Sequence, residues 1–150
     1  PLAFEPDTLE NKEIGFKTEF MKMSFEQVAS PRGIKDMASY RDGVRIYRKG
    51  TPIHVKGALI FNDLLKRHGI RNIQPIADGD KIKFSYLKMP NPIKDTVISV
   101  PDFLPDEFEL DRYIDRELQF QKTFLDPIRS ICDIIGWKLE EVATLENFFS

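Results

Sequence analysis

The sequence predicts an α+β fold in which helices pack on a small antiparallel sheet. Residues 81–88 alternate apolar and polar side chains with a period of two, as a half-buried strand does. Residues 96–100 are rich in β-branched side chains and predict a second strand. Three further stretches, 16–23, 57–68 and 111–136, space their apolar residues as amphipathic helices do. A chain of 150 residues is long enough to bury a core from these elements.

The N-terminal third is expected to hold short elements. The first helix places Phe16, Phe20 and Met23 on one face, and residues 24–29 are expected to be extended or irregular. A turn is predicted at 30–33, where proline fixes φ and glycine permits positive φ. A second short helix follows, and then a loop at 41–43. That second helix covers 34–40, with three inward residues: Ile34, Met37 and Ala38.

The central helix is predicted from Gly57 to His68, with Gly69 as its C-terminal stop. Pro52 disfavours helical conformation in the residue before it, so the chain entering this helix is expected to be extended. Its apolar positions are Leu59, Ile60, Leu64 and Leu65.

Residues 73–77 and 81–88 flank Asp78-Gly79-Asp80 and are predicted to pair as a hairpin. Lysines alternate with apolar residues in the second strand, so one face of the hairpin would be basic. The two aspartates could be metal ligands, but a hairpin turn needs no metal, and the turn is the favoured interpretation.

The longest helical stretch is 111–136, with an apolar stripe along one side. Asp126-Pro127 fits an N-cap followed by proline at the first helical position, so a break or kink is expected there. The stripe contains the single cysteine, Cys132, which is expected to be a buried, inert thiol in a reducing compartment. Its residues are Ile114, Leu118, Phe120, Phe124, Leu125, Ile128, Ile131, Cys132 and Ile135.

Several function classes lack support. No run of eighteen apolar residues predicts a membrane span, and the N-terminus does not read as a signal peptide. His54 and His68 have no partner at zinc-ligand spacing, and no phosphate-binding glycine loop, nucleophile elbow or HExxH motif occurs. The pattern favours a non-enzymatic binding module or a non-catalytic part of an enzyme.

Charge is unevenly distributed although the net charge is only −2. Residues 32–56 carry a local charge of +5, residues 57–101 a local +3, and residues 102–150 a local −7. A basic middle between acidic ends indicates contact with a polyanion. The alternative is a set of solvated faces whose imbalance has no function.

The best polyanion candidate is the segment 48–57. Arg48, Lys49 and Lys56 supply charge, and Thr51 and His54 can donate hydrogen bonds to phosphate oxygens. Gly50 and Gly57 would let the backbone approach a ligand, and the following helix would add its positive end. The alternative is a purely structural Gly-Pro loop.

The C-terminus ends in an apolar group, Leu145, Phe148 and Phe149. One helical turn would bring these side chains together as a plug for a pocket on another protein. The alternative is that they fill the core of this same chain.

Several blocks, in order, resemble the C-terminal thumb region of family B DNA polymerases of T-even-type bacteriophages, especially the version in marine cyanophages. The resemblance covers roughly residue 16 to the end and leaves 1–15 unplaced. The blocks are residues 50–59, 76–82, 90–92, 120–124, 127 and 143–150.

The resemblance implies a thumb-like domain, 16–141, that grips duplex primer–template DNA, and a flexible peptide, 142–150, that docks on the sliding clamp. Leu145, Phe148 and Phe149 would be the clamp anchors, although Val142 stands where such peptides often have glutamine. The DNA ligands would be drawn from the basic middle. They are Arg32, Lys35, Arg48, Lys49, Thr51, His54, Lys56, Lys81 and Lys83.

The resemblance also implies that the catalytic carboxylates and their Mg²⁺ ions lie in another portion of the polymerase, so no cofactor is expected in this chain. The chain would be a fragment, or the small product of a split gene that pairs with a catalytic portion, in the cytoplasm of an infected bacterium. The alternative is a stand-alone replication accessory protein that binds the clamp without gripping DNA.

Overall fold

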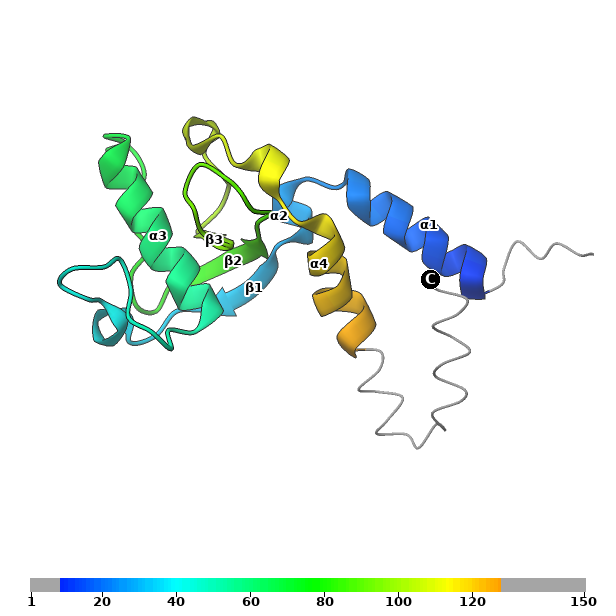
Figure 1. Ribbon diagram of the computed structural model, residues 1–150, viewed down its shortest axis with the longest axis horizontal. Coiled ribbons are helices and arrows are strands. Elements are labelled where there is room, and N and C mark those ends of the chain that lie inside the picture. The colour runs from blue at the N-terminus through cyan, green and yellow to red at the C-terminus, as the bar shows by residue number, and fades with distance from the viewer. Residues whose placement is uncertain (1–8, 128–150) are drawn as a thin grey trace, which may run out of the picture. The chain divides into compact units, whose positions relative to one another are not determined.

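The computed structural model describes residues 9–127, with side chains from Gly15 onward (Figure 1). These residues fall into two compact units. The larger is Ser24–Asp115, and the smaller combines the described parts of residues 1–23 and 116–150. Within residues 9–127, none of the helices combines the length and hydropathy of a membrane span.

The larger unit is built on a three-stranded antiparallel sheet of order β1-β2-β3 (Figure 1). The strands are β1 (Ser30–Gly33), β2 (Lys81–Tyr86) and β3 (Val97–Val100). β3 is fully buried, as its β-branched sequence requires. Together with the helix described below, this sheet confirms the predicted α+β class.

The predicted hairpin partner of β2 is wrong. β2 pairs with β1, which lies about fifty residues earlier, and with β3. Residues 30–33 were expected to form a turn, but they form the edge strand β1, where proline is tolerated. Ile34 N–H donates to the Asp80 carbonyl at 2.9 Å. In an antiparallel pair the backbone N–H and C=O groups of every second residue point toward the partner strand, so those of residues 34, 32 and 30 point toward β2. The nitrogen of Pro31 therefore faces away from the sheet.

The turn at Asp78-Gly79-Asp80 is confirmed. Gly79 has φ of +92°, and its N–H donates to the Ile34 carbonyl at 2.8 Å. The carboxylate of Asp78 accepts the Met37 N–H and that of Asp80 accepts the Ala77 N–H, both at 2.9 Å. A backbone N–H group thus holds each of the two carboxylates in the turn.

Helix α3 (Ile53–Arg67) crosses the sheet over β3. It begins directly after Pro52, four residues earlier than predicted, and the predicted apolar positions are all buried. Gly69 ends it with φ of +63°, as predicted. Ala58 and Phe61 have no exposed surface, and the Phe61 ring meets Phe108 with centroids 5.6 Å apart.

The glycine at position 57 brings α3 against β3. A Cβ atom there would lie 2.7 Å from the backbone nitrogen of Ser99 and 3.0 Å from the carbonyl carbon of Ile98. The Ser99 hydroxyl donates to the His54 carbonyl at 2.8 Å, which fixes the first turn of α3 on the strand. The close approach that Gly57 allows is therefore made to β3, and the prediction of an approach to a ligand is wrong for this residue.

Two short helices precede the loop that enters α3. Helix α2 (Phe25–Val28) occupies the region predicted to be extended or irregular, and the capping box formed by Ser24 and Gln27 opens it. The predicted helix at 34–40 is reduced to the 3₁₀ turn η1 (Met37–Tyr40). Ile34 and Met37 are buried as predicted, whereas Ala38 is exposed.

The predicted helix from residue 111 starts later. Residues 101–115 wind through two 3₁₀ turns, η2 (Asp106–Phe108) and η3 (Asp111–Tyr113), and Ile114 bridges to Leu87 beside β2. Within the larger unit, this segment buries Phe108 and Leu110.

The smaller unit contains α1 (Leu9–Lys22), α4 (Arg116–Phe120) and the π-helical turn η4 (Gln121–Leu125). The predicted apolar face of α1 packs on α4 and η4 through aromatic rings. Phe20 meets Phe120 at 5.3 Å and Phe16 meets Phe124 at 5.8 Å, both edge to face.

The backbone does not break at Asp126, which keeps helical φ and ψ of −61° and −46°. A wider π turn precedes Pro127 instead. It accommodates the proline, which has no N–H and whose ring crowds the preceding turn. The predicted stripe beyond Pro127, including Cys132, lies outside the described residues.

Candidate nucleic-acid interface

All nine predicted DNA ligands lie in the larger unit. Five are exposed: Arg32, Lys35, Arg48, Lys49 and Lys81. Four are half-buried: Thr51, His54, Lys56 and Lys83. The predicted clamp anchors Leu145, Phe148 and Phe149 lie outside the described residues.

The loop that carries Arg48 and Lys49 closes on itself beside the first turn of α3 (Figure 1). Arg48 N–H donates to the Tyr40 carbonyl at 2.8 Å, and the Thr51 hydroxyl donates to the Arg48 carbonyl at 2.5 Å. Gly50 has φ of +87°, a conformation that favours glycine, so this residue shapes the loop. The two cationic side chains are left exposed at the entry to α3.

Lys56 is engaged inside the protein. Its ammonium lies 3.2 Å from a carboxylate oxygen of Asp95 and 4.8 Å from the centroid of the Tyr47 ring. The Tyr47 hydroxyl donates to the other Asp95 oxygen at 2.7 Å. The Lys56 side chain is 23% exposed and that of Asp95 only 14%. We call these three residues the Tyr47 cluster.

Protonation in the Tyr47 cluster favours the ion pair. Burial alone would lower the pKa of Lys56, but Asp95 and the Tyr47 hydroxyl outweigh it and raise that pKa. Burial, followed by the hydrogen bond to Asp95, raises the pKa of Tyr47. At neutral pH Lys56 is therefore an ammonium and Tyr47 a phenol.

Arg32 and His54 lie on the face of the sheet that α3 covers. The Arg32 guanidinium stacks over the Phe84 ring at 5.4 Å, and its Nη1 donates to the Pro31 carbonyl at 2.7 Å. Burial, and then the charge of Arg32, lower the pKa of His54. The neutral form of His54 is thereby favoured, and its ring N–H can donate a hydrogen bond to a phosphate.

Lys81 and Lys83 lie on the opposite face of the sheet. They pair with Gly33 and Pro31, whereas Arg32 pairs with Ile82, and side chains alternate between faces along a strand. Lys83 is half-buried and its ammonium donates to the Glu26 carbonyl at 3.4 Å. The sheet therefore separates these two lysines from Arg32 and His54.

Sequence reasoning missed the two residues that surround Lys56, because Tyr47 and Asp95 are 48 positions apart. It also counted Arg41 and Arg45 only as charge, although both are exposed on the same loop. Their signal was present in the sequence as the density of arginine between 41 and 48.

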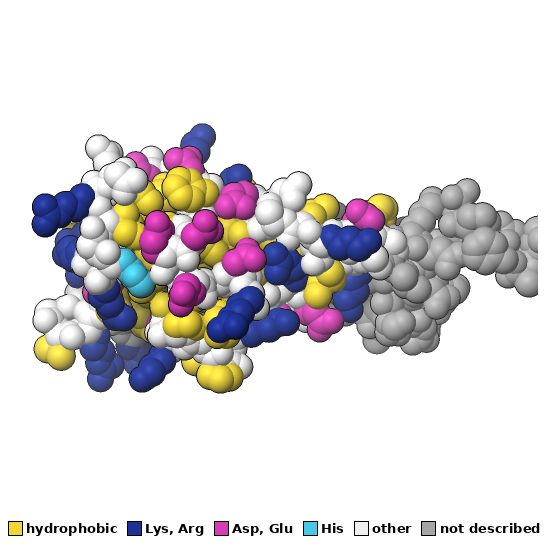
Figure 2. All heavy atoms as spheres, turned by 90° about the horizontal axis from the view of Figure 1, so that it is seen from above, with side chains coloured by type: hydrophobic (Ala, Val, Ile, Leu, Met, Phe, Trp, Pro, Cys, Tyr) yellow, Lys and Arg dark blue, Asp and Glu magenta, His cyan; other side chains and the backbone are white. Residues whose placement is uncertain are grey.

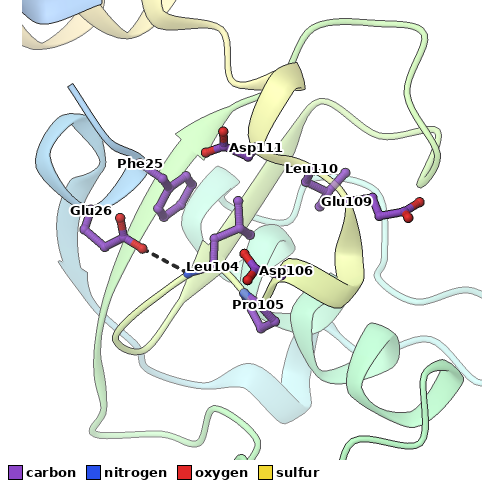
Figure 3. A pocket seen from close by; sticks show the side chains of 8 residues that line it. All are labelled: Phe25, Glu26, Leu104, Pro105, Asp106, Glu109, Leu110 and Asp111. Carbon is purple, nitrogen blue, oxygen red and sulfur yellow. Dashed lines mark hydrogen bonds between the residues drawn. The ribbon is translucent and has the colours of Figure 1, made fainter. Parts of the chain in front are cut away.

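Another face of the larger unit is acidic. A cavity of about 340 Å³ lies between α2 and the segment 104–111 (Figure 3). Glu26 at its edge accepts the Leu104 N–H at 3.3 Å. On the face shown in Figure 2, acidic side chains gather over the left-hand part, and Lys and Arg side chains lie along its left and lower edge. The residues that line the cavity between α2 and the segment 104–111 are Phe25, Glu26, Leu104, Pro105, Asp106, Glu109, Leu110 and Asp111.

This acidic cavity repels phosphate, so a polyanion would bind elsewhere on the unit. Among residues 9–127, no group of three His, Cys, Asp or Glu side chains is arranged to hold a metal ion. The cations at the entry to α3 remain the best-supported candidate site.

Comparison with known proteins gives one informative similarity. No family model matches the chain. The chain is 30% identical over 143 residues to the DNA-directed DNA polymerase of Enterobacteria phage T4. The match covers 89% of this chain but only 15% of that polymerase. The chain is thus related to one region of a phage DNA polymerase.

Proposed function

We propose that this chain is the thumb portion of a phage replicative DNA polymerase, which grips the primer–template duplex and docks on the sliding clamp through its C-terminus. The observation that carries the proposal is the similarity to a phage polymerase along nearly the whole chain. The exposed cations beside the first turn of α3 support it, since such groups bind phosphates with little regard to base sequence.

The division of roles follows from this proposal. Arg32, Arg48 and Lys49 contact phosphates, and Thr51 and His54 add hydrogen bonds at the N-terminal end of α3. Lys35, exposed just after β1, contributes a further cation. Lys81 and Lys83, on the other face of the sheet, contact a different part of the duplex or none.

The chemistry of polymerisation belongs to another portion of the protein in this proposal. Mg²⁺ and the carboxylates that hold it lie there, and this chain is either a fragment or a subunit that pairs with it. The complex works in the cytoplasm of the infected bacterium. The clamp peptide raises the local concentration of the polymerase at the primer end, so even weak docking has an effect.

Duplex binding is expected to depend steeply on salt. Replacing Arg48 and Lys49 together by alanine should reduce the slope of log K against log salt by about 2, because each phosphate contact contributes about 0.9. Fluorescence anisotropy with a labelled primer–template between 50 and 200 mM salt, typical low and moderate values, measures it.

The matched control is the double variant Lys66→Ala with Arg71→Ala. Both cations are exposed, and Lys66 lies in the last turn of α3, at the far end from Arg48. The control should keep the wild-type slope. If the intact chain does not bind duplex DNA, or if both double variants lower the slope equally, the grip is refuted.

Clamp binding is expected to reside in the last residues. Replacing Leu145, Phe148 and Phe149 by alanine should weaken binding to a phage sliding clamp by about 30-fold or more, the cost of losing buried anchors. Surface plasmon resonance with immobilised clamp measures it. Asn147→Ala with Ser150→Ala, in the same peptide, is the control.

The melting temperature of the triple variant separates the alternatives. An unchanged value with lost clamp binding supports the docking peptide. A marked fall would place these residues in the core of the chain and contradict docking. Clamp binding without any duplex binding would favour the stand-alone accessory protein.

A further inference from the structure

We propose that residues 41–49 form a preformed contact for nucleic-acid phosphates, with Arg41 and Arg45 as additional ligands, and that the Tyr47 cluster holds this loop in its binding position. The proposal rests on the proposed function and extends it to residues outside the predicted set. It also changes the role of Lys56 from phosphate ligand to positioning residue.

The charge of the loop suits a polyanion. Four cations and one acid lie between residues 41 and 49, and all four cations are exposed. The Asp42 carboxylate accepts the Val44 N–H at 3.0 Å, and this bond, with the nearby arginines, lowers the pKa of Asp42. Asp42 thus stabilises the turn through its hydrogen bond to Val44, and the side chains of Arg41 and Arg45 are exposed to solvent.

The tip of the loop is open to a ligand. Val44 is 95% exposed, so the tip does not pack on the described part of the chain. Arg41 and Arg45 flank it on either side. An exposed tip of this kind leaves phosphates free to approach the two arginines.

The base of the loop is fixed by the Tyr47 cluster. Tyr47 belongs to the loop, Lys56 to α3 and Asp95 to the segment before β3, so their contacts tie these three parts together. Asp95 is itself held, because its carboxylate accepts the Thr96 N–H at 2.8 Å and its carbonyl accepts the side-chain amide of Asn91 at 2.7 Å. Asn91 is 8% exposed, so the anchor is part of the packed structure.

A loop held this way binds with less loss of conformational freedom than a mobile one. Fixing it before binding raises affinity without adding a contact. The engaged carboxylate of Asp95 also means that a phosphate must compete with a half-buried, hydrogen-bonded carboxylate for Lys56. The geometry therefore assigns Lys56 to the ion pair with Asp95 and the arginines to the ligand.

Three variants of the full chain test the assignment with a labelled primer–template duplex. Arg41→Ala with Arg45→Ala should reduce the salt slope by about 2. Lys56→Met should leave the slope unchanged, since its ammonium does not reach DNA. Tyr47→Phe, which removes only the hydroxyl, should weaken binding several-fold at every salt concentration with the slope unchanged.

Each contrary result has a defined meaning. If Lys56→Met lowers the slope by about 1, Lys56 is a direct ligand and the positioning role is wrong. If Asp95→Asn strengthens binding, Asp95 competes with DNA and does not position the loop. If Tyr47→Phe lowers the melting temperature but leaves affinity unchanged, the cluster is structural only.

The same experiment separates this inference from the proposed function. A wild-type chain that does not bind duplex DNA refutes the proposed function. A wild-type chain that binds, with an Arg41/Arg45 variant that behaves like the Lys66/Arg71 control, refutes only the inference. Equal affinity for anionic lipid vesicles and for duplex DNA would overturn the choice of nucleic acid as the ligand.

Discussion

Replacing Gly57 by alanine is expected to lower the free energy of unfolding by about 2–3 kcal/mol, as overpacking of a tight contact does. In an open helix the same change would stabilise by up to about 1 kcal/mol. The sign reverses here because the new Cβ would meet Ser99 N at 2.7 Å and the Ile98 carbonyl carbon at 3.0 Å. Both are backbone atoms of β3, so no side-chain rotation relieves the contact. Urea unfolding followed by circular dichroism measures the change.

Gly15→Ala is the matched control. Gly15 is also within a helix, α1, but a Cβ atom there would meet nothing within 4 Å. This variant should be neutral or stabilising. If Gly57→Ala proves as stable as Gly15→Ala, α3 does not lie as close to β3 as described.

Phe61→Ala is expected to cost about 4 kcal/mol, in the range for removing a buried aromatic ring. Phe61 has no exposed surface and meets Phe108 edge to face. The ring joins α3 to the segment 101–115, so its loss leaves a cavity between them. The midpoint of thermal or urea unfolding reports the loss.

Phe103→Ala provides the comparison, since Phe103 belongs to the same unit but is 52% exposed. It should change stability by less than about 1 kcal/mol, because little apolar surface returns to water. Equal losses in the two variants would contradict the core described for the larger unit.

The sequence anticipated the elements that depend on local periodicity. The apolar positions of α3 and the buried strand β3 repeat at the helical and strand periods, and both are present. The start of α3 was placed four residues too late because Pro52 suggested extended chain, whereas Pro52 is the residue directly before the first helical turn. The close contact of Gly57 with a strand about forty residues later could not be read from the local pattern.

Long-range pairing was beyond the sequence pattern. β1 was expected to be a turn because proline and glycine suggest one locally, and only its partner β2 makes it a strand. The candidate site shows the same limit. Exposed cations could be found by composition, but Lys56 is neutralised by Asp95, 39 positions away, and no local rule indicates that pair.

The orientation of Pro31 bears on how the protein behaves when it is concentrated. Open sheet edges can recruit a strand from a neighbouring copy and grow into aggregates. At the outer side of β1 the ring nitrogen of Pro31 has no hydrogen to offer such a strand. That edge therefore resists pairing with an edge strand of another copy.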